Sequence, residues 1–299
     1  MLEFRELRLE DREAAEKIFF SLPYRLCDYS YSDLFIWQNV YKTRIAWEGG
    51  RVFFKFLWSN TPHYLVPVGE GNLKDALLLL QEDARKEGHP MLLSCVTPEL
   101  KAELEAAFPG RFAYEPTRDS FDYVYSAQQL ITLAGRKLHS KRNHVTRFRQ
   151  LGEWSYEPID AGNIAECHAM SDDWCKKYGC GMDASLRSEH CAVEQAFAHF
   201  FELGLLGGLI RQNGKVVAFS FGKRLCRDTF LTSIEKAYAE IEGAYAVINQ
   251  EFAAHNASEF AYINREDDAG DEGLRKAKLS YHPEILLEKS IASIPGGML

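Results

Sequence analysis

The strongest constraint on the fold is a succession of three strand-length apolar segments in the second half of the chain. An Asn213-Gly214 step separates the first two of these segments, and this dipeptide favours the tight turn of a β-hairpin. A helix-length segment and another apolar strand come next, so the order predicts an antiparallel meander, a crossover helix and a further strand. The ranges are Leu205–Arg211, Val216–Lys223, Asp228–Ile234, Ala244–His255 and Phe260–Ile263.

The first half shows a similar order, in which short strands precede the predicted helix Leu73–Glu87. This order is that of an acetyltransferase-like (GNAT-type) fold. We therefore predict an α/β (α+β) protein with tandem acetyltransferase-like mixed sheets flanked by helices. The 299 residues accommodate two domains of about 150 residues each. The expected halves are 1–152, which includes a basic linker helix, and 153–299.

The remaining elements follow from apolar periodicity and from cap residues, such as Thr97 before the predicted helix Pro98–Ala107. The further helices are Glu10–Phe20, Leu138–Leu151, Ala161–Lys177, Ser188–Phe201 and Glu272–Leu279. The further strands are Arg44–Trp47, Val52–Leu57, His63–Val66, Met91–Cys95, Phe121–Tyr125, Ser155–Pro158 and Glu284–Ser290.

Composition and charge narrow the classes of function. The formal net charge of −8 excludes a uniformly basic nucleic-acid-binding surface, so a polyanion would bind only at a local patch. The N-terminal segment lacks the pattern of a signal peptide, and no segment approaches the ~18 apolar residues of a membrane span. The seven cysteines are odd in number and form no CxxC pair. We therefore expect a cytoplasmic protein with reduced thiols and no transmembrane segment.

A basic stretch joins the two predicted halves. The range 135–149 contains six Lys or Arg, two His and no acidic residue. On a helix, Leu138, Val145 and Phe148 would share the buried stripe. Polar residues, including His139 and Asn143, would form a row on the opposite face that suits phosphates or an RNA backbone. The alternative is a solvated helix whose charges pair with acids elsewhere in the chain.

Polar residues follow the predicted strand Phe260–Ile263 directly. Asn264, Arg265 and Glu266 are therefore placed at the carboxyl end of a strand, where ligands bind in α/β folds. The alternative is a well-capped helix, because acidic residues begin the helix Glu272–Leu279 and basic residues follow them. That alternative does not account for the polar residues that come directly after the strand.

A third candidate is the glycine before the predicted helix Ala244–His255. Free backbone N–H groups at Gly243, Ala244 and Tyr245 would hold a pyrophosphate or an oxyanion. The alternative is an ordinary turn that leads into a helix.

The sequence predicts no metal site and no covalent nucleophile. Cysteines and histidines cluster between residues 167 and 191, but their spacing is not that of zinc ligands. A GxSxG elbow, a P-loop and a GxGxxG turn before a helix are all missing from the sequence. The clustered residues are Cys167, His168, Cys175, Cys180, His190 and Cys191.

Taken together, these motifs resemble an uncharacterised bacterial family, a domain of unknown function related to the C-terminal domain of phosphatidylglycerol lysyltransferases. The resemblance covers nearly the whole chain, in order and spacing. It is carried by the ranges 135–148, 262–270 and 274–278, which read GRKLHSKRNHVTRF, YINREDDAG and LRKAK.

The resemblance implies a tandem acetyltransferase-like fold, as in the aminoacyl-tRNA-dependent peptidoglycan transferases, and an acyltransferase activity. The donor substrate would be an aminoacyl-tRNA or an acyl-CoA, and no cofactor is certain. The basic helix would suit an RNA or phosphate donor. The acetyl-CoA pattern Arg/Gln-x-x-Gly-x-Gly/Ala would fall on Glu240, Gly243 and Tyr245, where only the glycine fits.

We therefore predict acyl or aminoacyl transfer from a small-molecule or tRNA donor to an amine or hydroxyl acceptor. The site is expected in the second half, with the basic helix contributing from the joining segment. Glu266 or Asp267 would orient the nucleophile or take its proton, with Asn264 beside them and Glu235 in reserve. The residues expected to bind anionic groups are Lys137, His139, Lys141, Arg142, Asn143, Arg265, Lys278 and Tyr281. The donor's carbonyl or phosphate would be held by Gly243, Ala244 and Tyr245.

Two other functions remain open. A non-catalytic module would bind an anionic metabolite or RNA at the same pocket, with strong salt dependence and no turnover in the case of RNA. An N-acetyltransferase would bind acetyl-CoA. A transferase needs an ionisable group on the acceptor side, whereas a binding module needs only hydrogen-bond donors. The donor, the acceptor and the oligomeric state are not determined by the sequence.

Overall fold

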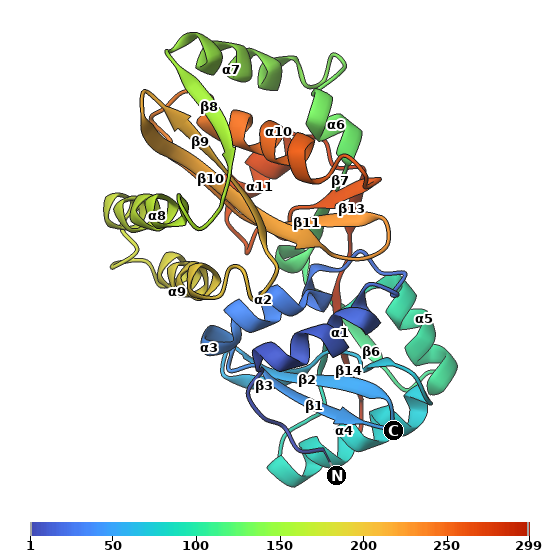
Figure 1. Cartoon of the computed structure of the whole chain (residues 1–299). Coiled ribbons are helices and arrows are strands. Elements are labelled where there is room, and N and C mark those ends of the chain that lie inside the picture. The colour runs from blue at the N-terminus through green and yellow to red at the C-terminus, as the bar shows by residue number, and fades with distance from the viewer. Residues whose placement is uncertain (1, 298) are drawn as a thin grey trace. The chain divides into compact units, whose positions relative to one another are not determined.

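The strand order predicted for the second half is present in the computed structural model, which describes residues 2–297 and 299. Strands β9 (Leu206–Gln212), β10 (Lys215–Arg224) and β11 (Thr229–Ala237) form an antiparallel meander. Helix α10 (Ala244–Asn256) leads to β12 (Tyr262–Asn264), which pairs with β11 in parallel. The full order of the sheet is β13-β7-β12-β11-β10-β9-β8 (Figure 1). Its remaining strands are β7 (Asp122–Ser126), β8 (Trp154–Pro158) and β13 (Ile285–Leu287).

Helices cover both faces of this second sheet. Phe219 and Phe221 of β10 contact Phe197 of α9, whereas Ala218 belongs to the core that includes Val247 of α10. Because neighbouring side chains of a strand point to opposite faces, α9 and α10 lie on different sides of the sheet (Figure 1). The other helices are α6 (Ala127–Thr132), α7 (His139–Gln150), α8 (Ile164–Tyr178), α9 (Ala184–Ala198) and α11 (Glu272–Leu279).

The first sheet has the strand order β1-β2-β3-β5-β14-β6, with β4 paired to β2. Helices α4 and α5 begin and end where the sequence predicted, and the side chains of Asn72 and Thr97 accept hydrogen bonds from their first turns. The strands are β1 (Arg44–Glu48), β2 (Arg51–Trp58), β3 (Thr61–Tyr64), β4 (Val68–Gly69), β5 (Leu93–Val96), β6 (Ala113–Pro116) and β14 (Ser290–Ser293). The helices are α1 (Arg12–Phe19), α2 (Tyr31–Ile36), α3 (Gln38–Tyr41), α4 (Leu73–Glu87) and α5 (Pro98–Ala107).

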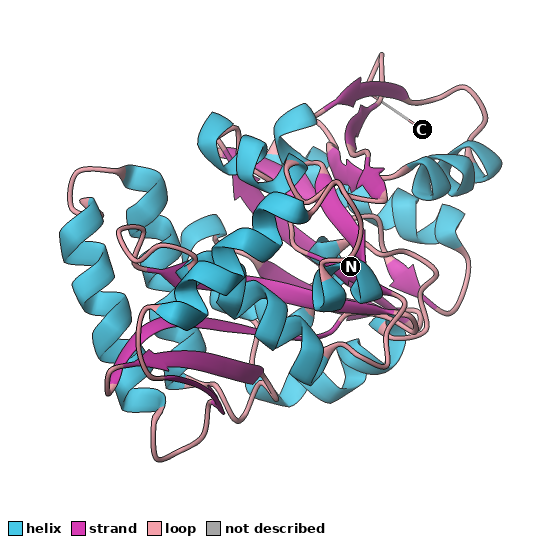
Figure 2. Cartoon of the chain, turned by 90° about the horizontal axis from the view of Figure 1, so that it is seen from above, coloured by secondary structure: helices cyan, strands magenta, loops and turns pink. Residues whose placement is uncertain are grey.

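The expected fold class is confirmed, because both sheets are mixed and are flanked by helices (Figure 2). In the part of the chain that the structure describes, no helix combines the length and the apolar character that a bilayer crossing requires. The last predicted strand is wrong as a single element. The range Glu284–Ser290 contains β13 in the second sheet, and β14 begins only at its end and belongs to the first sheet.

This split strand changes how the chain divides. One compact unit comprises Met1–Asp122, Asp267–Asp271 and Leu287–Leu299, and the other comprises Tyr123–Glu266 and Glu272–Leu286. The division therefore differs from the expected boundary at residue 152, because β7 and the basic helix α7 pack with the second sheet. Residues 1 and 298, which fall in the two predicted halves, are outside the described residues.

A buried lysine holds together three distant segments of the first unit. The Nζ atom of Lys289 lies 2.6 Å from Oδ2 of Asp28 and 2.7 Å from Oδ1 of Asp122. The side chains of Lys289 and Asp122 are 1% and 0% exposed. The thiols of Cys27 and Cys95 donate to Asp122 and Asp28 at 3.2 and 3.0 Å. Two carboxylates and two thiols therefore surround one ammonium group.

The expectation that every thiol is reduced is wrong for one pair. Cys175 and Cys180 form a disulfide, with their Cα atoms 5.2 Å apart. The two residues come together because Gly179 ends α8 in the left-handed conformation and turns the chain back. The free cysteines in the structure are Cys27, Cys95, Cys167, Cys191 and Cys226.

Candidate functional site

Arg265 lies at the carboxyl end of β12, where the sequence predicted a site. Its Nη2 atom donates to Oε1 of Glu235 at 3.0 Å. The guanidinium also lies 4.9 Å from the ring centroid of Tyr281 and 5.6 Å from that of Tyr125. Its Nη1 atom is buried and has no hydrogen-bond partner among the described residues. One edge of a buried cation is thus available to a ligand.

Glu235 links Arg265 to a buried asparagine. Its Oε2 atom accepts a hydrogen bond of 3.0 Å from Nδ2 of Asn249, a residue of α10 that is 3% exposed. The Oδ1 atom of Asn249 is buried and, like Nη1 of Arg265, lacks a partner in residues 2–297 and 299. Buried polar atoms in native proteins are nearly always paired. The two atoms therefore indicate a position for polar groups of a ligand, one accepting and one donating.

Lys141 of α7 adds a second cation. Its Nζ atom lies 4.1 Å from the ring centroid of Tyr281. Burial lowers the pKa of Lys141, and the nearby Arg265 lowers it further, whereas Glu235 acts in the opposite direction. The pKa of Tyr281 is raised, chiefly by burial, so the phenol is neutral at neutral pH. We name Arg265, Glu235, Asn249, Lys141, Tyr125 and Tyr281 the Arg265 cluster; its formal charge is positive, so it favours an anionic ligand.

Two predicted site residues support the loop that carries Arg265. The Nζ atom of Lys278 donates to the backbone carbonyl of Arg265 at 2.5 Å. Oδ1 of Asn264, which is fully buried, accepts from the backbone N–H of Glu266 at 2.6 Å. This bond holds Glu266 in the left-handed conformation, with φ of 56°. Lys278 and Asn264 thus position the backbone of the cluster.

Other predicted residues have contacts outside the cluster. Asp267 belongs to the first unit, and its carboxylate accepts from the N–H of Ala269 in a local turn. Arg142 donates to the carbonyls of Leu133 and Gly135, which ties down the loop before α7. Lys137, His139 and Asn143 are exposed, and the last two contact each other at 3.2 Å. Their binding roles stay predictions.

The basic helix α7 is partly paired with acidic residues, as the alternative interpretation expected. Arg147 contacts Glu242 and Arg149 contacts Glu251, each at 2.6 Å. The buried stripe of Leu138, Val145 and Phe148 is confirmed. Of the basic residues on this helix, Lys141 is the one that reaches the Arg265 cluster.

The predicted donor loop is packed closely against α7. Gly243 has φ of 86°, and a Cβ atom built on it would lie 2.3 Å from the carbonyl oxygen of His144. The N–H of Ala244 already donates to the carbonyl of Ile241 at 3.1 Å. Packing therefore explains the glycine, and the donor-binding role of Gly243, Ala244 and Tyr245 remains a prediction.

Replacement of Gly243 by alanine is expected to lower the free energy of unfolding by about 2–4 kcal/mol, because it adds a left-handed alanine and a clash. Gly179→Ala is the matched control: Gly179 has φ of 83°, but nothing lies within 4 Å of its built Cβ. This control should cost only about 1–2 kcal/mol. Urea denaturation of both variants measures the difference. Equal losses would contradict the close approach of α7.

Sequence analysis missed two members of the cluster. Nothing in the sequence marked Tyr125 as a site residue, because aromatic residues are common in buried strands. Asn249 did offer one, since it follows Ala246, Val247 and Ile248 on a mostly buried helix. A buried amide amid apolar neighbours needs partners and is therefore worth marking in a sequence.

Comparison with known proteins identifies chains that share this fold. A solved structure from Bacteroides thetaiotaomicron VPI-5482, a conserved protein of unknown function, is 41% identical over 99% of this chain and 100% of that chain, with a TM-score of 0.94. The C-terminal domain of a putative lysylphosphatidylglycerol synthetase from Agrobacterium fabrum shares the fold, with 14% identity over 96% of this chain and 92% of that chain and a TM-score of 0.67.

Among curated proteins, an uncharacterised protein of Mycoplasmoides gallisepticum is 22% identical over 186 residues, which are 58% of this chain and 56% of that protein. The chain thus spans about half the length of this curated relative. The family model described as "Phosphatidylglycerol lysyltransferase, C-terminal" matches residues 19–293. Because this match covers nearly the whole sequence, the chain belongs to the phosphatidylglycerol lysyltransferase C-terminal family.

Proposed function

We propose that this chain transfers an acyl or aminoacyl group from an activated donor to an amine or hydroxyl acceptor at the Arg265 cluster. Membership of a lysyltransferase family supports the reaction class. The observation that carries the site is the buried guanidinium of Arg265, which has one unpartnered edge at the carboxyl end of β12. Ligands of α/β sheets bind at this end of the strands.

Each polar group of the cluster has a distinct role in this proposal. Arg265 and Lys141 bind an anionic part of the donor, such as a phosphate. The Oδ1 atom of Asn249 accepts a hydrogen bond from the acceptor's amine or hydroxyl and so orients it. Glu235, held by Arg265 and Asn249 through its two oxygens, takes the proton that the nucleophile loses.

The reaction is direct transfer. The acceptor's lone pair attacks the donor's carbonyl carbon, and a new C–N or C–O bond forms. The bond from that carbon to the donor's ester oxygen, or to the sulfur of a thioester, breaks. The proton released by the acceptor passes through Glu235 to the leaving group. No covalent enzyme intermediate is needed.

The descriptions of the relatives favour an aminoacyl donor. The family is named for a lysyltransferase, and the Agrobacterium relative is described as a putative lysylphosphatidylglycerol synthetase. Exposed basic residues at the start of α7, among them Arg136 and Lys137, would contact the backbone of a tRNA. This contact predicts that binding of a tRNA donor weakens steeply with salt.

A ligand screen tests the proposal. The purified chain would be mixed with aminoacyl-tRNA, uncharged tRNA, acetyl-CoA and longer acyl-CoAs, and thermal stability and product mass would be measured. A ligand at 100 times its dissociation constant adds about 2.7 kcal/mol of apparent stability. Stabilisation by aminoacyl-tRNA together with an acylated product would support the proposal. A CoA thioester as the single donor would move the activity to the acetyltransferase class.

A non-catalytic binding module is the second candidate, and one observation favours it. Both oxygens of Glu235 already accept hydrogen bonds, from Arg265 and from Asn249, so the carboxylate would have to take a proton while it is paired. Turnover by the unsubstituted chain separates the candidates, and Glu235→Gln then tests the assigned base, because glutamine keeps the shape of glutamate but cannot act as a base. A transferase should bind its donor and lose turnover, whereas unchanged turnover would contradict Glu235 as the base.

A further inference from the structure

A second polar cluster lies outside the Arg265 cluster, on two packed helices of the second unit. His168 and Asp172 lie one turn apart on α8, and His190 and Glu194 lie one turn apart on α9. Residues four positions apart share one face of a helix. Each helix therefore presents one imidazole and one carboxylate to the other helix.

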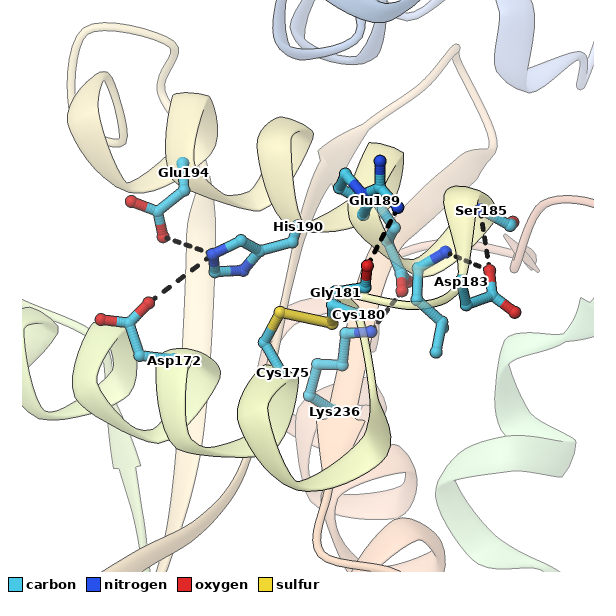
Figure 3. Close-up of a disulfide and its surroundings, with 12 residues drawn as sticks. Asp172, Cys175, Cys180, Gly181, Asp183, Ser185, Glu189, His190, Glu194 and Lys236 are labelled. Carbon is cyan, nitrogen blue, oxygen red and sulfur yellow. Dashed lines mark hydrogen bonds and ion pairs between the residues drawn. A yellow bond between two sulfur atoms is a disulfide. The ribbon is translucent and has the colours of Figure 1, made fainter.

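Side-chain contacts between the two helices bring these groups together. Nε2 of His168 lies 2.7 and 2.8 Å from the two carboxylate oxygens of Glu194. Nε2 of His190 lies 3.7 Å from Oδ1 of Asp172 and 4.0 Å from Oε1 of Glu194, as Figure 3 shows. Ligand atoms of His168, Asp172 and Glu194 all lie within 4.8 Å of one another. Three groups that can bind a metal thus converge, and His190 lies beside two of them.

We infer that His168, Asp172, His190 and Glu194 form a binding site for a divalent transition-metal ion, of which Zn²⁺ is the best fit. Zinc binds imidazole nitrogen and carboxylate oxygen at about 2.0–2.2 Å in tetrahedral geometry, which places neighbouring ligand atoms about 3.3 Å apart. The imidazole–carboxylate separations of 2.7–4.0 Å bracket that value, and the ligand atoms of His168, Asp172 and Glu194 stay within 4.8 Å of one another. Rotation of the His190 side chain would add the fourth ligand.

The charge of the cluster supports a bound cation. In the described part of the chain, the ion-pair partners of the Asp172 and Glu194 carboxylates are these two imidazoles, and no Lys or Arg forms an ion pair with either. The carboxylates around Lys289 differ, since an ammonium group is centred between them. A divalent ion would balance the two negative charges of this cluster in the same way.

The surroundings provide an entry path and a fixed ligand. A surface cavity of about 410 Å³ is lined by Asp172 and His190, together with residues of the disulfide-bonded turn after α8. The ring of His168 packs against Phe197 at 5.4 Å, which limits its rotation. Packing around a ligand that fixes its orientation strengthens metal binding. A bound ion would link α8 to α9 beside the second sheet.

The spacing of these residues along the chain did not indicate a metal site. The separation of 22 positions between His168 and His190 does not match any short zinc motif. The ligands form two pairs at i and i+4 on separate helices, and the pairs meet only because α8 packs on α9.

The test is titration of the chelator-treated full chain with ZnCl₂ by calorimetry. We expect one Zn²⁺ per chain, bound at least about tenfold more weakly in His168→Gln and in His190→Gln, because loss of even an outer-shell partner costs 10–100-fold. His89→Gln is the matched control, since His89 faces a single carboxylate, that of Glu87, at 3.2 Å. The Zn²⁺ affinity of the His89→Gln variant should equal that of the unsubstituted chain.

Three further measurements keep the result interpretable. Cys191→Ser removes the exposed thiol next to His190 and should leave Zn²⁺ binding unchanged. Co²⁺ should give the intense visible bands of a tetrahedral site without a sulfur charge-transfer band. Circular dichroism would confirm that the histidine variants are folded. Absence of Zn²⁺ binding, or binding that survives either histidine variant, would overturn the inference.

Discussion

Replacement of Lys289 by methionine is expected to lower the free energy of unfolding by about 3–5 kcal/mol, because it leaves buried carboxylates without their cation. Asp122 is fully buried, and its Oδ1 atom lies 2.7 Å from the ammonium group of Lys289. Methionine keeps the length and the apolar stem of lysine, so the loss reports on the charge and not on a cavity. Chemical denaturation monitored by circular dichroism measures it.

The pH dependence of this effect has a defined sign. Burial raises the pKa of Asp28, but the charge and hydrogen bond of Lys289 outweigh it, and the net direction is downward. Stability from a lowered carboxyl pKa is present above the ordinary Asp pKa of about 3.9 and is lost as the pH falls through the lower folded value. The variant lacks this contribution, so the difference between it and the unsubstituted chain should shrink on acidification from pH 7.

Two further variants identify the cause. Lys86→Met breaks an exposed pair with Glu82 and should leave stability nearly unchanged, because exposed ion pairs contribute little. The triple variant Lys289→Met, Asp28→Asn, Asp122→Asn removes all three charges and should recover most of the loss. A triple variant as unstable as Lys289→Met would show that shape, and not charge, determines the effect.

Replacement of Arg265 by glutamine is expected to reduce kcat/KM for transfer by about 10²–10³-fold, the usual effect of removing one preorganised donor to a charged group. Glutamine is neutral and cannot present the planar fork of arginine. The substitution removes the Nη1 atom, which has no hydrogen-bond partner within residues 2–297 and 299, and the guanidinium contacts with Tyr125 and Tyr281. Steady-state kinetics with the donor found in the ligand screen gives the ratio.

Arg211→Gln is the matched control, because it removes an arginine that forms ion pairs with Glu157 and Glu166 outside the cluster. It should keep full transfer activity. If Arg265→Gln does not fold, the double variant with Glu235→Gln removes both charges of the pair and should fold while remaining inactive. A folded Arg265 variant with full turnover would show that the reaction occurs elsewhere.

Local sequence signals predicted most elements of the fold. Helices α4, α5 and α11 match their predicted ranges because caps and end residues are local. The short elements α2, α3 and β6 were missed, since four to six residues carry too little periodicity. The split of the last strand was also missed. Which sheet a strand joins depends on contacts far away in the chain, and β13 and β14 are only two residues apart.

For the candidate site, the sequence predicted the position of Arg265 but not the full set of residues around it. The rule for strand ends placed Arg265 correctly at the end of β12. Its partners come from β7, β11, α7 and α10, and no local pattern joins Tyr125 to Asn249. Glu235 had been considered a reserve, yet it is the carboxylate that Arg265 contacts. Asp267 was preferred by its position in the motif, but its side chain closes a local turn.

Because β14 lies between β5 and β6 in the first sheet, this sheet cannot close until residues 290–293 have left the ribosome. At roughly 5–20 residues per second, the ribosome needs several seconds to half a minute for the segment between β6 and β14. During that interval β5 and β6 have open edges, and Asp122 has no Lys289 beside it. Until β14 is synthesised, the open edges of β5 and β6 are therefore exposed to edge-to-edge pairing with other chains.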